Sequence, residues 1–538
     1  MKFVIVVAFV SLVIGADRSA AQAHSHSPST PAEQLGTVHF PTSCDSRVAG
    51  RFDRGVALLH SFEFGASIRA FNDVLATDSS CAMAYWGIAL SRWTNPMAAG
   101  TRTAAQLEPG RQAADAGLRV ASRATARERG YLAAVAELYK DYEHADQGTR
   151  VAAYARAMRQ LVAAQPADTE AKIFYAIALT AAAPPTDKTY ANQLAAGRIL
   201  EPIWAKQPNH PGLAHYIIHT YDVPALAPKA AAAAQRYAAI APSAAHALHM
   251  PSHTFTRLGE WQKSIETNAR SADVALRDSA IGEALHASDY ATYAHLQLAQ
   301  DDAAKALLDR LPSLAARFNP NAITGAAPAS AGVFALAAMP ARYALERRDW
   351  PTAAALTPTA SSFPWTEAMV YFARSLGASH TGDTAAARIG ADTLAVLHER
   401  VAAKGESYWA EQVEIQRIGA RAWLALAERR PDTALVLMRD AARREDATEK
   451  SAVTPGPLAP ARELLGDMLM ELRRPREALA EYRATLRKEP NRFRSLYGAM
   501  RAASLAGDAR SAKQYRATLK ALCAKSDVPG RAELADIR

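Results

Sequence analysis

The 538-residue sequence contains little cysteine, and this scarcity limits the chemistry open to it. Its three cysteines form no CxxC redox pair and no CxxCH haem site. A glycine-rich phosphate loop, a GxSxG nucleophile elbow and the HExxH pattern of metalloproteases are also missing. These absences favour no particular reaction class, and we expect a chain that is not an enzyme, without excluding one.

Glycine and proline are modest, at 27 and 29 residues, and runs of β-branched residues are scarce beyond the N-terminus. Hydrophobic residues nevertheless make up 49% of the chain, with alanine prominent, which is typical of helices that pack closely on small side chains. The chain is too long for one hydrophobic core, so we expect an all-α array of repeated units.

Long apolar runs are confined to the N-terminus. Residues 1–23 have a positive start, an apolar stretch over residues 3–16 and a small-x-small ending at Ala21-Gln22-Ala23, the pattern of a cleaved signal peptide. A retained anchor is the alternative. The pattern predicts an exported protein, periplasmic or secreted, with no transmembrane segment after cleavage. Residues 24–41 are rich in Ser, Pro and His and predict a flexible linker.

The net charge of +9 is spread along the chain. Lysine and arginine number 62 against 53 acidic residues, and the basic residues are interleaved with acidic ones. A nucleic-acid-binding surface concentrates its positive charge on one face. We therefore expect no nucleic-acid partner.

A 34-residue pattern of small and bulky positions recurs through the chain. Pro208 and Pro242 stand 34 residues apart at equivalent positions, and Gly55 and Gly466 occupy the small position of the first helix in their repeats. The best single copy is ARELLGDMLMELRRPREALAEYRATLRKEP. In composition and spacing these units resemble tetratricopeptide repeats.

The resemblance implies a right-handed superhelical solenoid of helix-turn-helix repeats. We expect two arrays, over residues 42–310 and 336–525, with a joint at 311–335 and a tail at 526–538. The blocks HPGLAHYIIHTYD and HALHMPSHTFTRLGEW also resemble a family of signal-bearing bacterial tetratricopeptide proteins that has no assigned activity. Such solenoids imply a scaffold that holds a protein segment, peptide or small ligand in a concave groove.

Five histidines fall at repeat-equivalent positions that the family implies line this groove. They are His215 and His219 in one repeat, and His246, His249 and His253 in the next. Residues four apart share one helix face, so the two sets should converge. Neutral imidazole binds Zn or Cu, and we therefore consider these five histidines a candidate metal site. Supporting residues of the groove are Tyr221, Asp222, His286, Asp289 and His60.

Two other interpretations of the histidines remain open. They could hydrogen-bond a ligand in the groove, or they could have ordinary structural roles. Pro251 falls inside a predicted helix, between His249 and His253, and should interrupt it there.

The repeat register also suggests a disulfide. Cys44 precedes the first helix of the first repeat and Cys81 follows its second helix, so the two residues should lie at the same end of the helix pair. In an oxidising compartment we expect them to be bonded, with Cys523 left over.

Overall fold

The computed structural model describes Met1 and residues 33–98 and 100–537. The predicted signal peptide, apart from Met1, and residues 24–32 lie outside the described residues. Gln34–Arg538 forms one compact unit. Its described residues are helical without a strand, which confirms the all-α prediction, and no helix among them is long and apolar enough to cross a membrane.

The first half of this unit contains fifteen α-helices. They are α1 (Ala49–His60), α2 (Phe64–Thr77), α3 (Ala82–Trp93), α4 (Ala104–Arg119), α5 (Ala126–Glu137), α6 (Gln147–Ala164), α7 (Thr169–Ala181), α8 (Ala191–Lys206), α9 (Pro211–Thr220), α10 (Ala227–Ile240), α11 (Ala245–His249), α12 (Pro251–Leu258), α13 (Trp261–Arg277), α14 (Ile281–Gln297) and α15 (Asp301–Asp309).

The second half contains eleven more. They are α16 (Leu311–Arg317), α17 (Ala329–Glu346), α18 (Trp350–Ala355), α19 (Pro364–Thr381), α20 (Thr384–Ala402), α21 (Ser407–Ala427), α22 (Pro431–Ala447), α23 (Ala461–Glu471), α24 (Pro475–Lys488), α25 (Phe493–Leu505) and α26 (Ala509–Leu522). Short 3-10 helices cover Ser46–Val48, Ala121–Arg123 and Ala532–Asp536.

The small positions of the repeat exist because a bulky ring fills the space beside them. A Cβ atom on Gly55 or on Gly87 would lie 2.9 or 2.3 Å from ring atoms of Phe71. Near the C-terminus, Gly466 and Gly498 bracket Tyr482 in the same way, at 2.8 and 2.3 Å. One aromatic ring from a second helix therefore packs between the first helices of two consecutive repeats.

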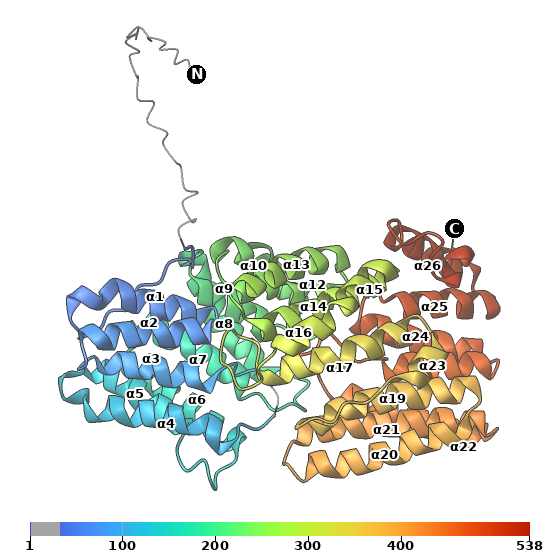
Figure 1. Cartoon of the computed structure of the whole chain (residues 1–538), viewed down its shortest axis with the longest axis horizontal. Helices are drawn as coiled ribbons and strands as arrows, with labels where there is room; N and C mark the ends of the chain where they lie inside the picture. Colours follow the sequence, from blue (N-terminus) through green and yellow to red (C-terminus); the bar gives the residue numbers. More distant parts are fainter. Residues whose placement is uncertain (2–32, 99, 538) are drawn as a thin grey trace. The chain divides into compact units, whose positions relative to one another are not determined.

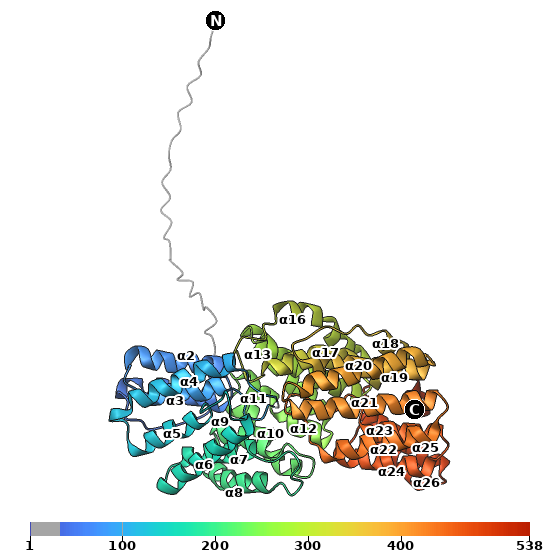
Figure 2. The same ribbon diagram turned by 90° about the horizontal axis from the view of Figure 1, so that it is seen from below.

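Most consecutive helices pack against each other, and many first helices also contact the first helix of the next repeat, as α1 contacts α3 and α21 contacts α23. This is the contact pattern of a helix-turn-helix solenoid, so the repeat prediction is confirmed. In Figure 1, α9 to α14 lie between the N-terminal helices α1–α5 and the C-terminal helices α20–α26, and Figure 2 shows α11 to α13 in the same intermediate place.

The predicted joint at residues 311–335 is packed and largely helical. One large hydrophobic cluster runs from Leu35 to Phe255, with Ala326, and a second from Ala331 to Ala503. A smaller cluster joins Leu285 of α14 to Leu311, Leu314 and Met339 across the joint. The two arrays therefore meet through apolar contacts.

The two terminal segments differ from the prediction. At the C-terminus, Arg531 is 7% exposed and its Nη2 lies 2.6 Å from Oδ1 of Asp301, while Leu534 is buried. In the predicted linker, Phe40 is buried and Thr37 N donates to the carbonyl of Asn209 at 3.0 Å. Their apolar residues and backbone bonds find partners that lie far away in sequence, so the described part of each segment is held against the fold.

The Cys44–Cys81 disulfide is present, with Cα atoms 4.9 Å apart, and Cys523 is a free, buried thiol. The bond ties the segment before α1 to the start of α3. The N-terminal edge of the solenoid, which has a neighbouring repeat on one side only, is thereby secured.

Candidate metal centre

Three histidines meet between α9 and α11. His215 and His219 lie one turn apart on α9, and His246 lies on α11. One ring nitrogen from each lies within 4.8 Å of the other two. The Nε2 atoms of all three are buried and have no hydrogen-bond partner among the described residues. We call this set the first triad.

Three more histidines meet beside it. His249 ends α11, His253 lies in the first turn of α12, and His286 comes from α14. Their ring nitrogens also lie within 4.8 Å of one another. The Nε2 atoms of His249 and His253 are 3.0 Å apart, and the Nδ1 atom of His286 is buried without a partner. We call this set the second triad.

The predicted helix break lies within this arrangement. α11 ends at His249 and α12 begins at Pro251, with Met250 between them. Proline has no N–H to donate, and the following bond from His253 N to the Met250 carbonyl spans three residues, as in a 3-10 turn. The break lies between His249 and His253 of the second triad, as predicted.

The outward nitrogens of four imidazoles are held by acceptors. The Nδ1–H groups of His215 and His249 donate to the His60 carbonyl and to Oδ1 of Asn268, each at 2.6 Å. Those of His246 and His253 donate to the carboxylates of Glu283 and Asp222, at 3.0 and 2.9 Å. Carbonyl and carboxylate oxygens only accept, so Nδ1 carries the proton and each Nε2 is a lone pair.

Two lone pairs therefore face each other in the second triad. Both Nδ1 atoms are used as donors, and so the Nε2 atoms of His249 and His253, 3.0 Å apart, cannot form a hydrogen bond between neutral rings. A buried acceptor without a donor costs about 1–3 kcal/mol. A cation beside both nitrogens removes this cost.

A proton is a poor candidate for that cation. Burial, and the neighbouring imidazoles next, hold the pKa of four rings well below the usual value of histidine, those of His215, His219, His249 and His286. For His253 burial outweighs the opposing Asp222 carboxylate and lowers the pKa to about 4. At neutral pH these rings are uncharged, which is the form that binds metal.

Asp222 connects the second triad to two cationic side chains. Its carboxylate accepts from His253, from Nε of Arg257 and from Nζ of Lys450, each at 2.9 Å. Burial alone would raise the pKa of Asp222, but the charges of Lys450 and Arg257 hold it well below its usual value. The carboxylate is therefore ionised when it orients the His253 ring.

An aromatic ring covers the second triad. Tyr290, one turn after His286 on α14, has its ring centroid 4.9 Å from those of both His249 and His253. Its hydroxyl donates to the Thr454 carbonyl at 3.0 Å and lies 3.4 Å from Nζ of Lys450. The loop between α22 and α23 thus contacts the centre from 160 residues or more away in sequence.

Of the other residues predicted to support the site, Asp222 does so directly and His286 joins the second triad itself. His60 contributes through its backbone carbonyl. Tyr221 does not take part, because its hydroxyl donates to Glu201 of α8 at 2.6 Å. Asp289 lies 3.7 Å from Arg342 in a buried pair, where burial raises the pKa of its carboxyl to about 6.

The His60 side chain belongs to a third cluster. His60 and His210 each place Nε2 2.9 Å from an oxygen of the Glu170 carboxylate. Burial would raise the pKa of Glu170, but the two histidines hold it below its usual value. Here both Nε2 atoms already have a carboxylate partner, while the Nδ1 atom of His210 is buried without a partner among the described residues.

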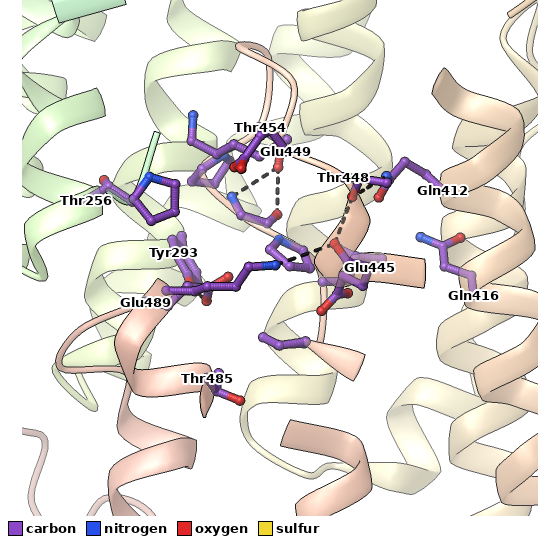
Figure 3. Close-up of a pocket in the computed structure, with 18 of the residues that line it drawn as sticks. Thr256, Tyr293, Gln412, Gln416, Glu445, Thr448, Glu449, Thr454, Thr485 and Glu489 are labelled. Atoms are coloured by element: carbon purple, nitrogen blue, oxygen red, sulfur yellow. Dashed lines mark hydrogen bonds between the residues drawn. The ribbon is translucent and has the colours of Figure 1, made fainter. Parts of the chain in front are cut away.

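The expected open groove is not where the histidines lie. All six triad residues are buried, and the most exposed, His219, is 6% exposed. The open space lies next to them, in a pocket of about 100 Å³ between α12–α14 and the second array. Figure 3 shows Thr256 and Tyr293 on one side of it and Gln412 and Gln416 on the other. Lys450 and Arg257 also line it, so the pocket adjoins the partners of Asp222.

No protein-family model and no curated protein sequence matches the chain. Among solved structures it is similar to a human IFIT1 dimer with m7Gppp-AAAA, at 10% identity and a TM-score of 0.39, over 90% of this chain and 96% of that one. It is also similar to an APC/C hetero-tetramer, Cut9-Hcn1, at 12% identity and a TM-score of 0.33, over 91% and 89%. Similarities this low assign no activity to the chain.

Proposed function

We propose that this protein binds two transition-metal ions, one in each histidine triad. The observation that carries the proposal is the pair of Nε2 lone pairs of His249 and His253, which face each other at 3.0 Å while their Nδ1 atoms donate elsewhere. The first triad repeats the arrangement with three partnerless Nε2 atoms. Imidazole nitrogen is a common ligand of Zn and Cu, and hydrogen bonds to the outer Nδ1 atoms fix the orientation of the ligating rings.

Metal content tests this directly. The protein, made without a histidine tag, is stripped with chelator, reloaded with Zn(II) or Cu and measured by mass spectrometry of the metal. We expect two ions per chain, and one ion per chain in His215→Ala and in His253→Ala. His144→Ala, whose side chain is 78% exposed, is the matched control and should keep two. Uptake that is unchanged by both triad substitutions would sink the proposal.

A second role is favoured by the pocket of Figure 3. We propose that it holds a small ligand or one side chain, because about 100 Å³ is too small for a helix or an extended segment. Gln416 lines it with a buried Oε1 that has no partner among the described residues, so a ligand that donates a hydrogen bond would satisfy it.

N-acetyl amino-acid amides, which carry such a donor, are suitable probes. Binding should raise the melting temperature of the protein and should weaken in Gln416→Leu. Gln193→Leu serves as control, because Gln193 lies outside the pocket and its Oε1 atom is also buried without a partner among the described residues. Equal responses in all three proteins would exclude the pocket as the binding place.

We also propose that the chain is exported. The Cys44–Cys81 bond supports this, because disulfides persist in oxidising compartments. Mass spectrometry of the protein from its source cell should find a mature N-terminus at His24. A chain that retains Met1 in the reducing cytoplasm would contradict export.

A further inference from the structure

The two triads are immediate neighbours. α11 gives His246 to the first and His249 to the second, and their ring centroids are 5.7 Å apart. A second pair across the boundary, His219 and His253, has centroids 5.9 Å apart. Two ions held by these rings would therefore lie side by side, close enough for one small ligand to touch both.

The donor set is unusual for a metal pair. Six imidazoles supply it, and the carboxylates of Asp222 and Glu283 reach the triads only through the outward Nδ1 atoms of His253 and His246. Metal pairs such as Mg²⁺, Mn²⁺ or di-iron centres take carboxylate oxygens as direct ligands. Imidazole alone suits copper and zinc.

The total charge of the two bound ions distinguishes copper(I) from zinc at this site. Two zinc ions would bring four positive charges into a buried site. Asp222 is already paired with Arg257 and Lys450. The carboxylates left nearby are Glu283, which bonds His246 and the backbone N–H of Ala327, and Glu63, which accepts from the backbone N–H of His246. Two copper(I) ions bring only two charges, and uncompensated charge is costly when buried. Monovalent copper therefore suits this surrounding better.

The pair is not sealed on all sides. His219 and His286, one from each triad, keep 6% and 4% of their surface exposed, while the other four rings are exposed by 2% or less. A molecule of two or three atoms that reaches the ions would approach past these two rings. The walls on the buried side are aromatic, with Phe62 beside the first triad and Tyr290 beside the second. A ligand that reaches the ions past these two rings would have to be small, and an uncharged one loses least on burial.

We propose that the two sites form a coupled copper pair that binds dioxygen between the ions. In the binding step each copper(I) gives one electron, both ions become copper(II), and dioxygen is reduced to bound peroxide with its O–O single bond intact. No proton and no further reductant is needed. This inference rests on the proposed function, because it requires both triads to hold metal.

The test uses the full chain loaded with two equivalents of copper(I) without air and then exposed to oxygen. We expect uptake of one dioxygen per copper pair, an intense new absorption band in the near ultraviolet, and no copper(II) electron-paramagnetic-resonance signal after oxygenation, because two bridged copper(II) ions pair their spins. A protein that holds two copper ions but gives the full signal of isolated copper(II) would overturn the pair and leave the proposed function standing. A protein that takes up no metal would overturn both.

Single-site variants supply the second arm. His219→Ala and His286→Ala should each keep one copper, take up no dioxygen and show an isolated copper(II) signal after chemical oxidation. His144→Ala should behave as the parent. If either triad variant still takes up one dioxygen per chain with a silent signal, bridging between the triads is refuted, whatever the variant does to stability.

Discussion

Replacing Asp222 with asparagine should weaken metal binding at the second triad and leave the first triad unchanged. The carboxylate bonds His253, Arg257 and Lys450 at 2.9 Å each, and its side chain is only 10% exposed. Asp222→Asn leaves two cations buried beside the triad without their anion. Loss of one partner of a buried ion pair costs about 3–5 kcal/mol of stability. Loss of the carboxylate behind a ligating histidine weakens metal binding by about 10–100-fold.

Chelator competition measures metal affinity at each site, and urea unfolding measures stability. We expect the weaker affinity at one ion only, with the ion of the first triad unchanged. Lys450→Met removes one of the stranded cations, so the double variant should recover part of the stability lost in Asp222→Asn. Equal loss of affinity at both sites, or none at either, would refute the role of Asp222.

Three further outcomes follow from the structure. The Cys44–Cys81 bond closes a sequence separation of 37 residues, so Cys44→Ser with Cys81→Ser should lower the unfolding free energy in urea by about 3–4 kcal/mol, and an unchanged value would mean that the bond is absent. A methyl group on Gly212 would lie 2.4 Å from Nδ1 of His60, so Gly212→Ala should shift α9. Chelator competition should then show weaker metal binding at the first triad alone, and an unchanged affinity there would contradict the packing. Burial raises the pKa of Glu445 from 4.5 to about 7, so the folded chain holds a proton that the unfolded chain releases, and stability falls as the pH rises through that window. Glutamine does not titrate, so the unfolding free energy of Glu445→Gln relative to the parent should rise by about 1–2 kcal/mol between pH 4.5 and 7. This expected rise is smaller than the full pKa shift implies, because solvent reaches part of the Glu445 side chain. A constant difference would refute the raised pKa.

Much of this centre could be predicted from the sequence because repeats impose a register. His215 and His219 stand at positions equivalent to His249 and His253, so a shared face follows from helix geometry alone. The break at Pro251 follows from the missing N–H of proline. The closeness of the two sets is also a consequence of adjacent repeats.

The partners that complete the centre could not be predicted in this way. Lys450 lies 228 residues from Asp222, in an irregular loop between α22 and α23, and no local pattern links the two. Asn268 and Glu283 belong to helices whose periodicity indicates packing positions, so nothing marks them as acceptors for imidazole. The register predicts an open concave face for the histidines. The loop that carries Lys450 and Thr454, together with α14, covers that face instead.

The most direct test of the central claim is an anomalous-difference map from a crystal of the metal-loaded protein, recorded at the absorption edge of the added copper or zinc. The account predicts two strong peaks, one within bonding distance of His215, His219 and His246 and one within bonding distance of His249, His253 and His286. A map without a peak in either triad, or with its only peak between His60, Glu170 and His210, would contradict it.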